Sequence, residues 1–102
     1  MNIVVNAGEL ESKVTLGLFG RLDTTTAPEL QKELLGQIET GMEVVLDFKE
    51  LKYVSSAGLR VLLMGEKAAK GKDTTMKLIN VNEEVMEVFD MTGFANVLNI
   101  VK

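Results

Sequence analysis

The first part of the chain carries the pattern of two strands. Val14, Leu16 and Leu18 alternate with less apolar residues, which is typical of a strand with one buried face. A shorter β-branched run at residues 3–5 precedes them. The polar residues between the two runs predict an antiparallel hairpin, whose second strand we expect to end at Gly20.

A first helix is predicted directly after this hairpin. Thr26 and Glu29 have the spacing of a capping box, and Pro28 is tolerated in a first helical turn. The helix should end before Gly41. Its apolar face consists of Leu30, Leu34, Leu35 and Ile38.

The middle of the chain predicts a strand, a polar connection and a second helix. The apolar run at residues 44–46 suits a buried strand, and the polar residues 47–52 read as a connection. The serines at 55–56 then precede apolar residues at helical spacing, which is a signal for a helix start. This helix is expected over about residues 57–70, with Gly71 as its C-terminal stop.

The last third of the chain predicts a strand, a helix and a short final strand. Residues 74–79 read as the strand, with Met76, Leu78 and Ile79 as its buried set. Asn80 and Asn82 can cap the following helix, which Met91-Thr92-Gly93 should end. Its inward face consists of Val85, Val88 and Phe89, and residues 97–101 suggest the final strand.

The predicted element order is β-β-α-β-α-β-α-β. Strands that alternate with amphipathic helices indicate an α/β fold. Right-handed crossovers make the later strands parallel, so the sheet should be mixed. With 102 residues, the chain is expected to form a single domain, residues 1–102.

The start of the second helix is the main candidate for chemistry. The first backbone N–H groups of a helix lack partners, and the helix dipole adds roughly half a positive charge there. One of Ser55 and Ser56 suffices as the cap, which leaves the other hydroxyl where a phosphate is tolerated. The simpler alternative is that both serines only cap and solvate the turn. Arg60, one turn after Ser56, is either a solvated side chain or the partner of a phosphate on Ser56.

Two aspartates allow alternative interpretations. Asp23 is either a turn residue that accepts hydrogen bonds from its own backbone or an acid at a functional surface. Asp47 is either a solvated acid after the central strand or an acceptor of phosphate, as in receiver domains. A receiver also needs an acidic pair after its first strand, and residues 3–5 are followed by none.

Composition narrows the possible functions. The sequence has no cysteine and no histidine, so it lacks disulfides, Ser-His-Asp triads and zinc sites built from those ligands. It has no Gly-rich phosphate-loop motif, and we expect no enzyme and no cofactor. The net charge of −4 argues against direct nucleic-acid binding. With no membrane-length apolar run and no secretory signal pattern at the N-terminus, a cytoplasmic location is expected.

Three segments together resemble the STAS domain, which is shared by bacterial anti-sigma-factor antagonists and the cytoplasmic parts of sulphate transporters. The segment LDFKELKYVSSAGLRVLL resembles the family signature around its phosphorylation site. GRLDTTTAPEL resembles the entry to the family's first helix, and FDMTGF resembles the turn after its third. The three motifs occur in the family's order and span nearly the whole chain.

The resemblance implies a phosphorylation-switched antagonist in a partner-switching circuit. The usual motif is Asp-Ser-Ser-Gly-Leu or Asp-Ser-Thr-Gly-Leu, and alignment on Gly58-Leu59 makes Ser56 the implied phosphoacceptor, with Ser55 as runner-up. Ser55 stands where the family often has Asp, and Ala57 stands at the second hydroxyl position, so kinase recognition could differ here. The implied partner-binding residues are Asp23, Thr24, Thr25, Ser55, Ser56, Ala57, Gly58 and Arg60.

The implied partners are an anti-sigma factor, which is also a serine kinase, and a serine phosphatase. The unphosphorylated domain would bind the anti-sigma factor and release the sigma factor. Two alternatives stay open: an accessory STAS subunit of a transporter or stress-signalling complex, and an aspartyl phosphorelay domain that uses Asp47.

Overall fold

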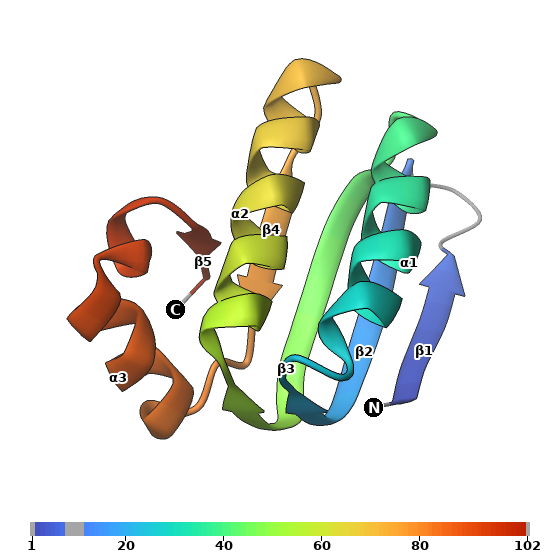
Figure 1. The fold of residues 1–102 in the computed structure, drawn as a ribbon. Coiled ribbons are helices and arrows are strands. Elements are labelled where there is room, and N and C mark those ends of the chain that lie inside the picture. The colour runs from blue at the N-terminus through green and yellow to red at the C-terminus, as the bar shows by residue number, and fades with distance from the viewer. Residues whose placement is uncertain (1, 8–11, 102) are drawn as a thin grey trace.

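The computed structural model describes residues 2–7 and 12–101, which form one sheet with helices packed against it (Figure 1). The strands are β1 (Asn2–Ala7), β2 (Lys13–Leu22), β3 (Glu43–Val54), β4 (Met76–Ile79) and β5 (Asn99–Ile100). The helices are α1 (Ala27–Glu39), α2 (Ser56–Gly71), α3 (Glu83–Thr92) and the short 3-10 helix η1 (Phe94–Asn96). The predicted element order is confirmed.

The five strands lie in the order β1-β2-β3-β4-β5. β1 pairs with β2 in antiparallel orientation, and the remaining neighbours are parallel. Parallel neighbours need crossover connections, and α1, α2 and α3 provide them. The mixed sheet and the antiparallel pairing of the first two strands are therefore confirmed. The turn between β1 and β2, at residues 8–11, lies outside the described residues.

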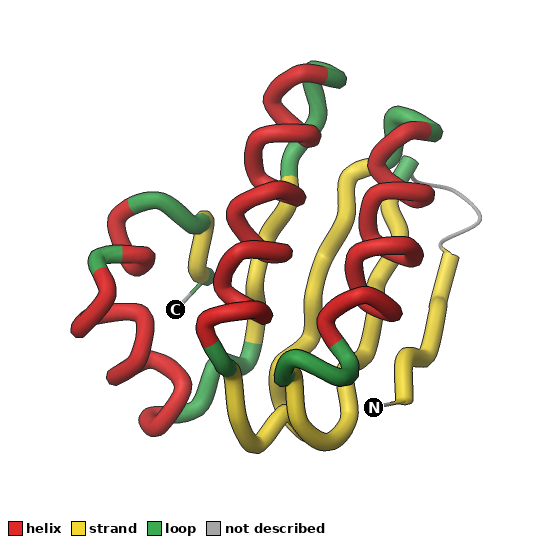
Figure 2. Tube along the Cα trace, viewed as in Figure 1, coloured by secondary structure: helices red, strands yellow, loops and turns green. Residues whose placement is uncertain are grey.

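The helices cover one face of the sheet. In Figures 1 and 2, α1 and α2 lie in front of the strands, and α3 lies at the β5 end. The side chains between the two layers form one apolar cluster. Leu16 and Leu46 are fully buried there, and the rings of Phe48 and Phe89 pack with centroids 6.1 Å apart. The alternating residues of β2 and the apolar helix faces together build this core.

The prediction that residues 47–52 form a connection is wrong, because they belong to β3. The pairing of β3 with β2 shifts twice, and each shift inserts one extra residue into β3. The first lies between the pairs Gly17–Asp47 and Phe19–Glu50, and the second between Gly20–Leu51 and Arg21–Tyr53. Such bulges break the two-residue period of a strand. The buried side chains in this part of β3 follow a spacing of three residues: Phe48, Leu51 and Val54.

Several predicted boundaries are also wrong. β2 passes Gly20, which adopts φ 101°, and continues to Leu22. Gly71 is the last residue of α2, and Lys72 follows as the C-cap. β4 begins only at Met76. The N–H groups of Val97 and Leu98 donate to the Phe94 carbonyl oxygen, so β5 begins only at Asn99 and has two residues.

Most of the residues predicted to face inward from α1, β4 and α3 are buried, with three exceptions. Leu35, Ile79 and Val88 are only half-buried. The end of α3 agrees with the prediction, because Gly93 adopts the left-handed conformation with φ 81°.

Candidate functional site

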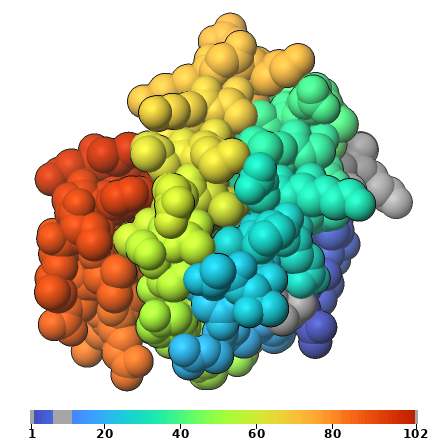
Figure 3. All heavy atoms as spheres, in the orientation of Figure 1, coloured from blue at the N-terminus to red at the C-terminus, as the bar shows by residue number. Residues whose placement is uncertain are grey.

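The carboxyl ends of β2 and β3 meet at one edge of the sheet, and the predicted site residues follow them directly. Leu22 pairs with Val54 at the end of the parallel ladder. The Ser55 backbone N–H donates to the Leu22 carbonyl oxygen at 2.8 Å. In Figure 3 the blue atoms of the β2–α1 connection and the yellow-green atoms at the start of α2 form adjoining parts of the surface. Residues 23–25 therefore lie beside residues 55–58.

The two serines have different surroundings. Ser55 is the N-cap of α2, with φ −93° and ψ 175°, and its Oγ accepts a hydrogen bond from the Gly58 N–H at 3.3 Å. Ser56 is the first residue of the helix, and its side chain is exposed. Within the described part of the chain, the Ser56 hydroxyl has no hydrogen-bond partner. The division into one capping serine and one available serine is the arrangement that the sequence suggested.

Gly58 fixes the position of this helix start. A Cβ at Gly58 would lie 2.6 Å from Leu22 Cγ and 3.2 Å from the Leu22 carbonyl oxygen. The missing side chain thus lets the first turn of α2 rest directly on the end of β2. Gly58 is buried and Ala57 is half-buried, so the accessible surface at this point belongs mainly to Ser56.

Asp23 closes the turn between β2 and α1. Its Oδ1 accepts hydrogen bonds from the Thr25 N–H at 3.0 Å and the Thr26 N–H at 3.2 Å. The Arg21 guanidinium lies 3.8 Å from Asp23 Oδ2. The hydrogen bond from Thr26, followed by that from Thr25 and the charge of Arg21, lowers the pKa of Asp23 from its ordinary value. Asp23 is therefore a turn residue, which was one of the two interpretations of this aspartate.

The predicted capping box at Thr26 is wrong. Thr26 is the N-cap of α1 but makes no side-chain cap hydrogen bond. Its Oγ1 instead donates to the Arg21 carbonyl oxygen at 2.7 Å and accepts from the Asp23 N–H at 2.9 Å. The Asp23 turn uses the hydroxyl that the capping box would need, and the Thr26 backbone (φ −97°, ψ −18°) is not in the extended conformation typical of a side-chain cap.

The remaining predicted contact residues are exposed. Thr24 and Thr25 lie at the tip of the turn, and Arg60 lies one turn along α2 from Ser56. No ion pair of Arg60 is found among the described residues. These three side chains and Ser56 can reach a partner without rearrangement of the fold.

Sequence analysis missed an aromatic contact beside this site. The Arg21 guanidinium stacks on the Tyr53 ring, 4.2 Å from its centroid, and Tyr53 is 41% exposed. The two residues are register partners on β2 and β3. Both stand two residues before a predicted site residue, Arg21 before Asp23 and Tyr53 before Ser55, but only the parallel register brings them together.

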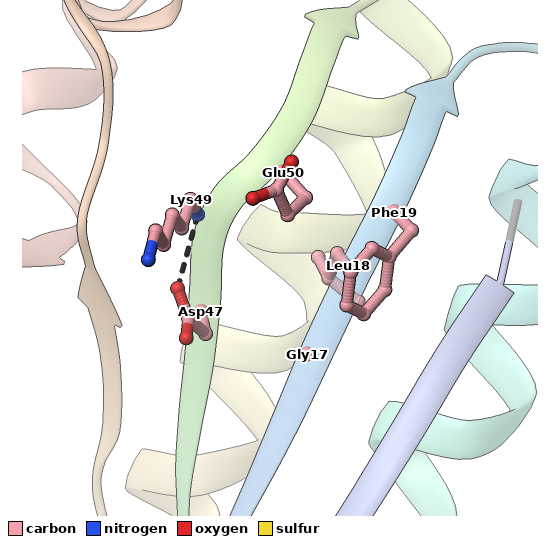
Figure 4. A pocket seen from close by; sticks show the side chains of 6 residues that line it. All are labelled: Gly17, Leu18, Phe19, Asp47, Lys49 and Glu50. Atoms are coloured by element: carbon pink, nitrogen blue, oxygen red, sulfur yellow. Dashed lines mark hydrogen bonds between the residues drawn. The ribbon is translucent and has the colours of Figure 1, made fainter.

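Asp47 lies away from this edge, in the interior of β3 rather than after it. It lines a hollow of about 220 Å³ on the sheet face opposite the helices, together with Gly17, Leu18, Phe19, Lys49 and Glu50 (Figure 4). Asp47 Oδ1 accepts from the Lys49 N–H at 3.0 Å and from Asn80 Nδ2 at 3.1 Å. These bonds tie the connection after β4 to β3, which is a structural role.

The described residues contain no group of three or more acidic side chains that could hold a metal ion. Among the same residues, none of the helices has the length and apolar character needed to cross a bilayer.

Fold and site together define a small α/β domain with an exposed serine at a helix start. The model of the family described as "Mlab, STAS domain" matches residues 5–102. The anti-sigma-B factor antagonist of Bacillus subtilis is 30% identical over 100 residues, which cover 98% of this chain and 92% of the relative. The chain therefore belongs to the STAS-domain family and is similar to its anti-sigma-factor antagonists.

Solved structures agree with this fold. The anti-sigma factor antagonist SpoIIAA in its unphosphorylated form superposes with a TM-score of 0.76 at 16% identity, over 99% of this chain and 88% of SpoIIAA. SpoIIAA of Bacillus in the phosphorylated form gives a TM-score of 0.74 at 17% identity, over 99% and 92% of the two chains. The predicted STAS fold is confirmed.

Proposed function

We propose that this chain acts as an anti-sigma-factor antagonist and that phosphate on Ser56 switches its binding surface. The surface consists of the exposed residues Thr24, Thr25, Ser56 and Arg60, which the buried or bonded residues Asp23, Ser55, Ala57 and Gly58 support from below. The unphosphorylated surface binds an anti-sigma factor and thereby frees a sigma factor. The names of the relatives, anti-sigma-B and anti-sigma-F factor antagonists, support this partner class.

The observation that carries the proposal is the position of Ser56. Its hydroxyl is exposed at the first position of α2, while the neighbouring Ser55 already caps the helix. A kinase can therefore modify Ser56 without removing the cap. Ser55 is the poorer acceptor, because phosphate on its Oγ would displace the hydrogen bond from the Gly58 N–H.

The folded domain can receive the phosphate. A phosphoserine adds about −1.5 to −2 charges at neutral pH. The free N–H groups and the dipole of α2 favour a negative charge at this end, and the first turn of α2 contains no acidic residue. Arg60, one turn away, can approach the phosphate from the same helix face.

The phosphate would act on binding rather than on folding. In a partner interface, a charge that is buried without compensation costs about 3–5 kcal/mol. Since about 1.4 kcal/mol corresponds to a tenfold change in affinity, the affinity for the partner can fall by two or more decades without a conformational change. SpoIIAA has been solved in both unphosphorylated and phosphorylated forms, which supports a switch of this kind.

The proposed circuit has two further members, an anti-sigma factor with serine kinase activity and a serine phosphatase, and it operates in the cytoplasm. The antagonist itself performs no chemistry in it. Pull-down with the unphosphorylated protein from its native extract tests the partner class. Recovery of a kinase-type anti-sigma factor is expected, and recovery of a transporter ATPase instead would favour an accessory STAS subunit.

Phosphopeptide mapping by mass spectrometry tests the acceptor. After incubation with the recovered kinase and ATP, phosphate is expected on Ser56 and absent in Ser56→Ala. Ser56→Ala should bind the anti-sigma factor constitutively, and Ser56→Asp should bind it at least about a hundredfold more weakly, the two decades estimated above. The matched controls Ser55→Ala and Thr24→Ala should keep phosphorylation on Ser56. Phosphate on Ser55 or on a threonine alone would refute the assignment.

A further inference from the structure

Glu66 in the second half of α2 is a buried acid without a partner. Its side chain is 8% exposed, and Oε1 is covered and has no hydrogen-bond partner among the described residues. A buried carboxylate oxygen without a donor is costly, so native proteins rarely keep one unless something else compensates it. No contact within the described chain accounts for this acid.

The close packing of α2 explains why Glu66 is buried. A Cβ on the preceding Gly65 would lie 2.6 Å from Leu34 Cδ2 and 2.8 Å from Met76 Sδ. The missing side chain draws this turn of α2 onto α1 and β4. In Figure 3 the C-terminal segment, drawn in red, meets α2, drawn in yellow, along a seam on this side of the molecule. Glu66 directly follows this close contact and lines the space between α2, β4 and the segment before β5.

A pocket of about 320 Å³ opens beside Glu66, between α2, the start of β4 and the segment that leads into β5. This volume lies in the range of small-molecule pockets. The lining combines apolar side chains with hydroxyl, amide and charged groups: Glu66, Lys70, Thr74, Thr75, Met76, Val97, Leu98 and Asn99. Such a mixed lining can contact the aliphatic part of a ligand and orient one polar group of it.

We propose that this pocket binds a small aliphatic ligand that places an ammonium or guanidinium group on the Glu66 carboxylate. Such a group supplies both the positive charge and the N–H donors that the carboxylate lacks. Of the two carboxylate oxygens only Oε1 is covered, so the ligand binds the other oxygen, and its positive charge compensates the charge that both oxygens share. The aliphatic part of the ligand would contact the apolar side chains of Met76, Val97 and Leu98.

Lys70 could itself be the partner of Glu66, so the test must distinguish it from a ligand. It lies one helical turn after Glu66, at the spacing of a favourable Glu-Lys pair, and it lines the same pocket. In the structure Lys70 is exposed, and no ion pair between the two side chains is found in the described part of the chain. We place Lys70 at the mouth of the pocket, where its ammonium stays in solvent.

The pocket is separate from the proposed phosphorylation site. Glu66 is ten residues beyond Ser56 on the same helix, which corresponds to roughly 15 Å along its axis. The test below uses neither kinase nor anti-sigma factor, so it can fail without affecting the proposed switch.

The experiment is an NMR titration of the whole isotope-labelled protein with agmatine, a small aliphatic guanidine. Shifts are expected in the backbone signals of Glu66, Thr75 and Asn99 and in the methyl signals of Met76 and Leu98. Glu66→Gln keeps the shape of the side chain but removes its charge, so it should weaken binding at least about tenfold, which corresponds to about 1.4 kcal/mol. Glutarate, an anionic chain of similar length, should cause no shifts at these positions.

A control variant tests whether agmatine binding depends on Glu66 in particular. Glu39→Gln removes an exposed acid from α1 and should bind agmatine like the wild type. Absence of shifts at millimolar agmatine, or equal binding by Glu66→Gln, would overturn the proposal.

A double-mutant cycle of Glu66→Gln and Lys70→Met, followed by urea unfolding without ligand, tests the competing pair. We expect additive effects and no loss of stability in Glu66→Gln. Coupling between the two sites would show that Lys70 is the partner of Glu66, and it too would overturn the proposal.

Discussion

The amino ends of α2 and α3 have the same capping geometry. Ser55 has φ −93° and ψ 175°, and Asn82 has φ −75° and ψ 168°. Each side-chain oxygen accepts from the backbone N–H three residues later, Ser55 from Gly58 at 3.3 Å and Asn82 from Val85 at 2.8 Å. Both helices follow strands of the same parallel ladder, so they begin at the same edge of the sheet.

The two helix ends differ in charge. The first turn of α3 contains Glu83 and Glu84, whereas the first turn of α2 contains no acid. With Lys52 and Asn82, the two glutamates line a hollow of about 420 Å³ before α3. The dipole of α3 is therefore already compensated by carboxylates, while that of α2 remains available to a phosphate on Ser56. Charge rather than backbone geometry distinguishes the proposed site from its neighbour.

The third helical position also differs between them. Gly58 of α2 has no room for a Cβ, whereas Val85 of α3 buries its side chain in the core. At this position α2 thus packs its backbone against Leu22 at the end of β2, whereas α3 packs a side chain into the core.

The largest stability effect is expected for Gly58→Ala. The new Cβ would lie 2.6 Å from Leu22 Cγ, so overpacking should lower the free energy of unfolding by about 1–3 kcal/mol. Gly36→Ala on α1 is the matched control, because nothing lies within 4 Å of its added Cβ. That control should raise the free energy of unfolding by up to about 1 kcal/mol through helix propensity. Urea unfolding measures both, and a Gly58→Ala protein as stable as the wild type would contradict the close contact.

Removal of the two caps should have smaller and unequal effects. Ser55→Ala and Asn82→Ala should each cost about 0.5–2 kcal/mol of unfolding free energy. Asn82→Ala should cost more, because Asn82 Nδ2 also donates to the Leu51 carbonyl oxygen at 3.0 Å and its cap bond is shorter. Thermal or urea unfolding at neutral pH gives the ranking. The reverse order would show that the caps contribute differently from their geometry.

Exchange of charge between the two helix ends should have the smallest effect. Ser56→Glu adds an acid at the first position of α2, and Glu83→Ser removes one from the same position of α3. We expect changes of about 0.3–1 kcal/mol in unfolding free energy, a gain for Ser56→Glu and a loss for Glu83→Ser. Both changes should shrink at high salt because the charges are exposed. Destabilisation by Ser56→Glu at low salt would mean that α2 does not tolerate the charge.

Helices were easier to predict than the central strand. The apolar face of α1 and the start and stop signals of α3 are local, so their residues identify them without knowledge of the rest. β3 was recognised only at its first residues, since its bulges against β2 replace the two-residue alternation with the three-residue spacing of Phe48, Leu51 and Val54. Bulges depend on the partner strand, and one strand's sequence does not reveal them.

Some features of the candidate site could likewise be predicted from the sequence, and others could not. The serine pair before a helix, and the glycine three residues after the first serine, can be read from the chain alone. The stacking of Arg21 on Tyr53 depends on the parallel register, and the diversion of Thr26 from a capping box depends on competition with Asp23. The unpartnered Oε1 of Glu66 was not anticipated, because its burial depends on segments distant in the sequence, β4 and the residues before β5, that line the same pocket.

For this protein, the amino-acid sequence by itself determined the order of strands and helices, the hydroxyl pair at the start of α2 and the absence of cysteine and histidine chemistry. Tertiary structure decided which serine is the cap, which strands are neighbours and which acid is buried. The physical reason is range: caps and periodic faces involve residues within about one helical turn, whereas burial and register depend on contacts between distant segments.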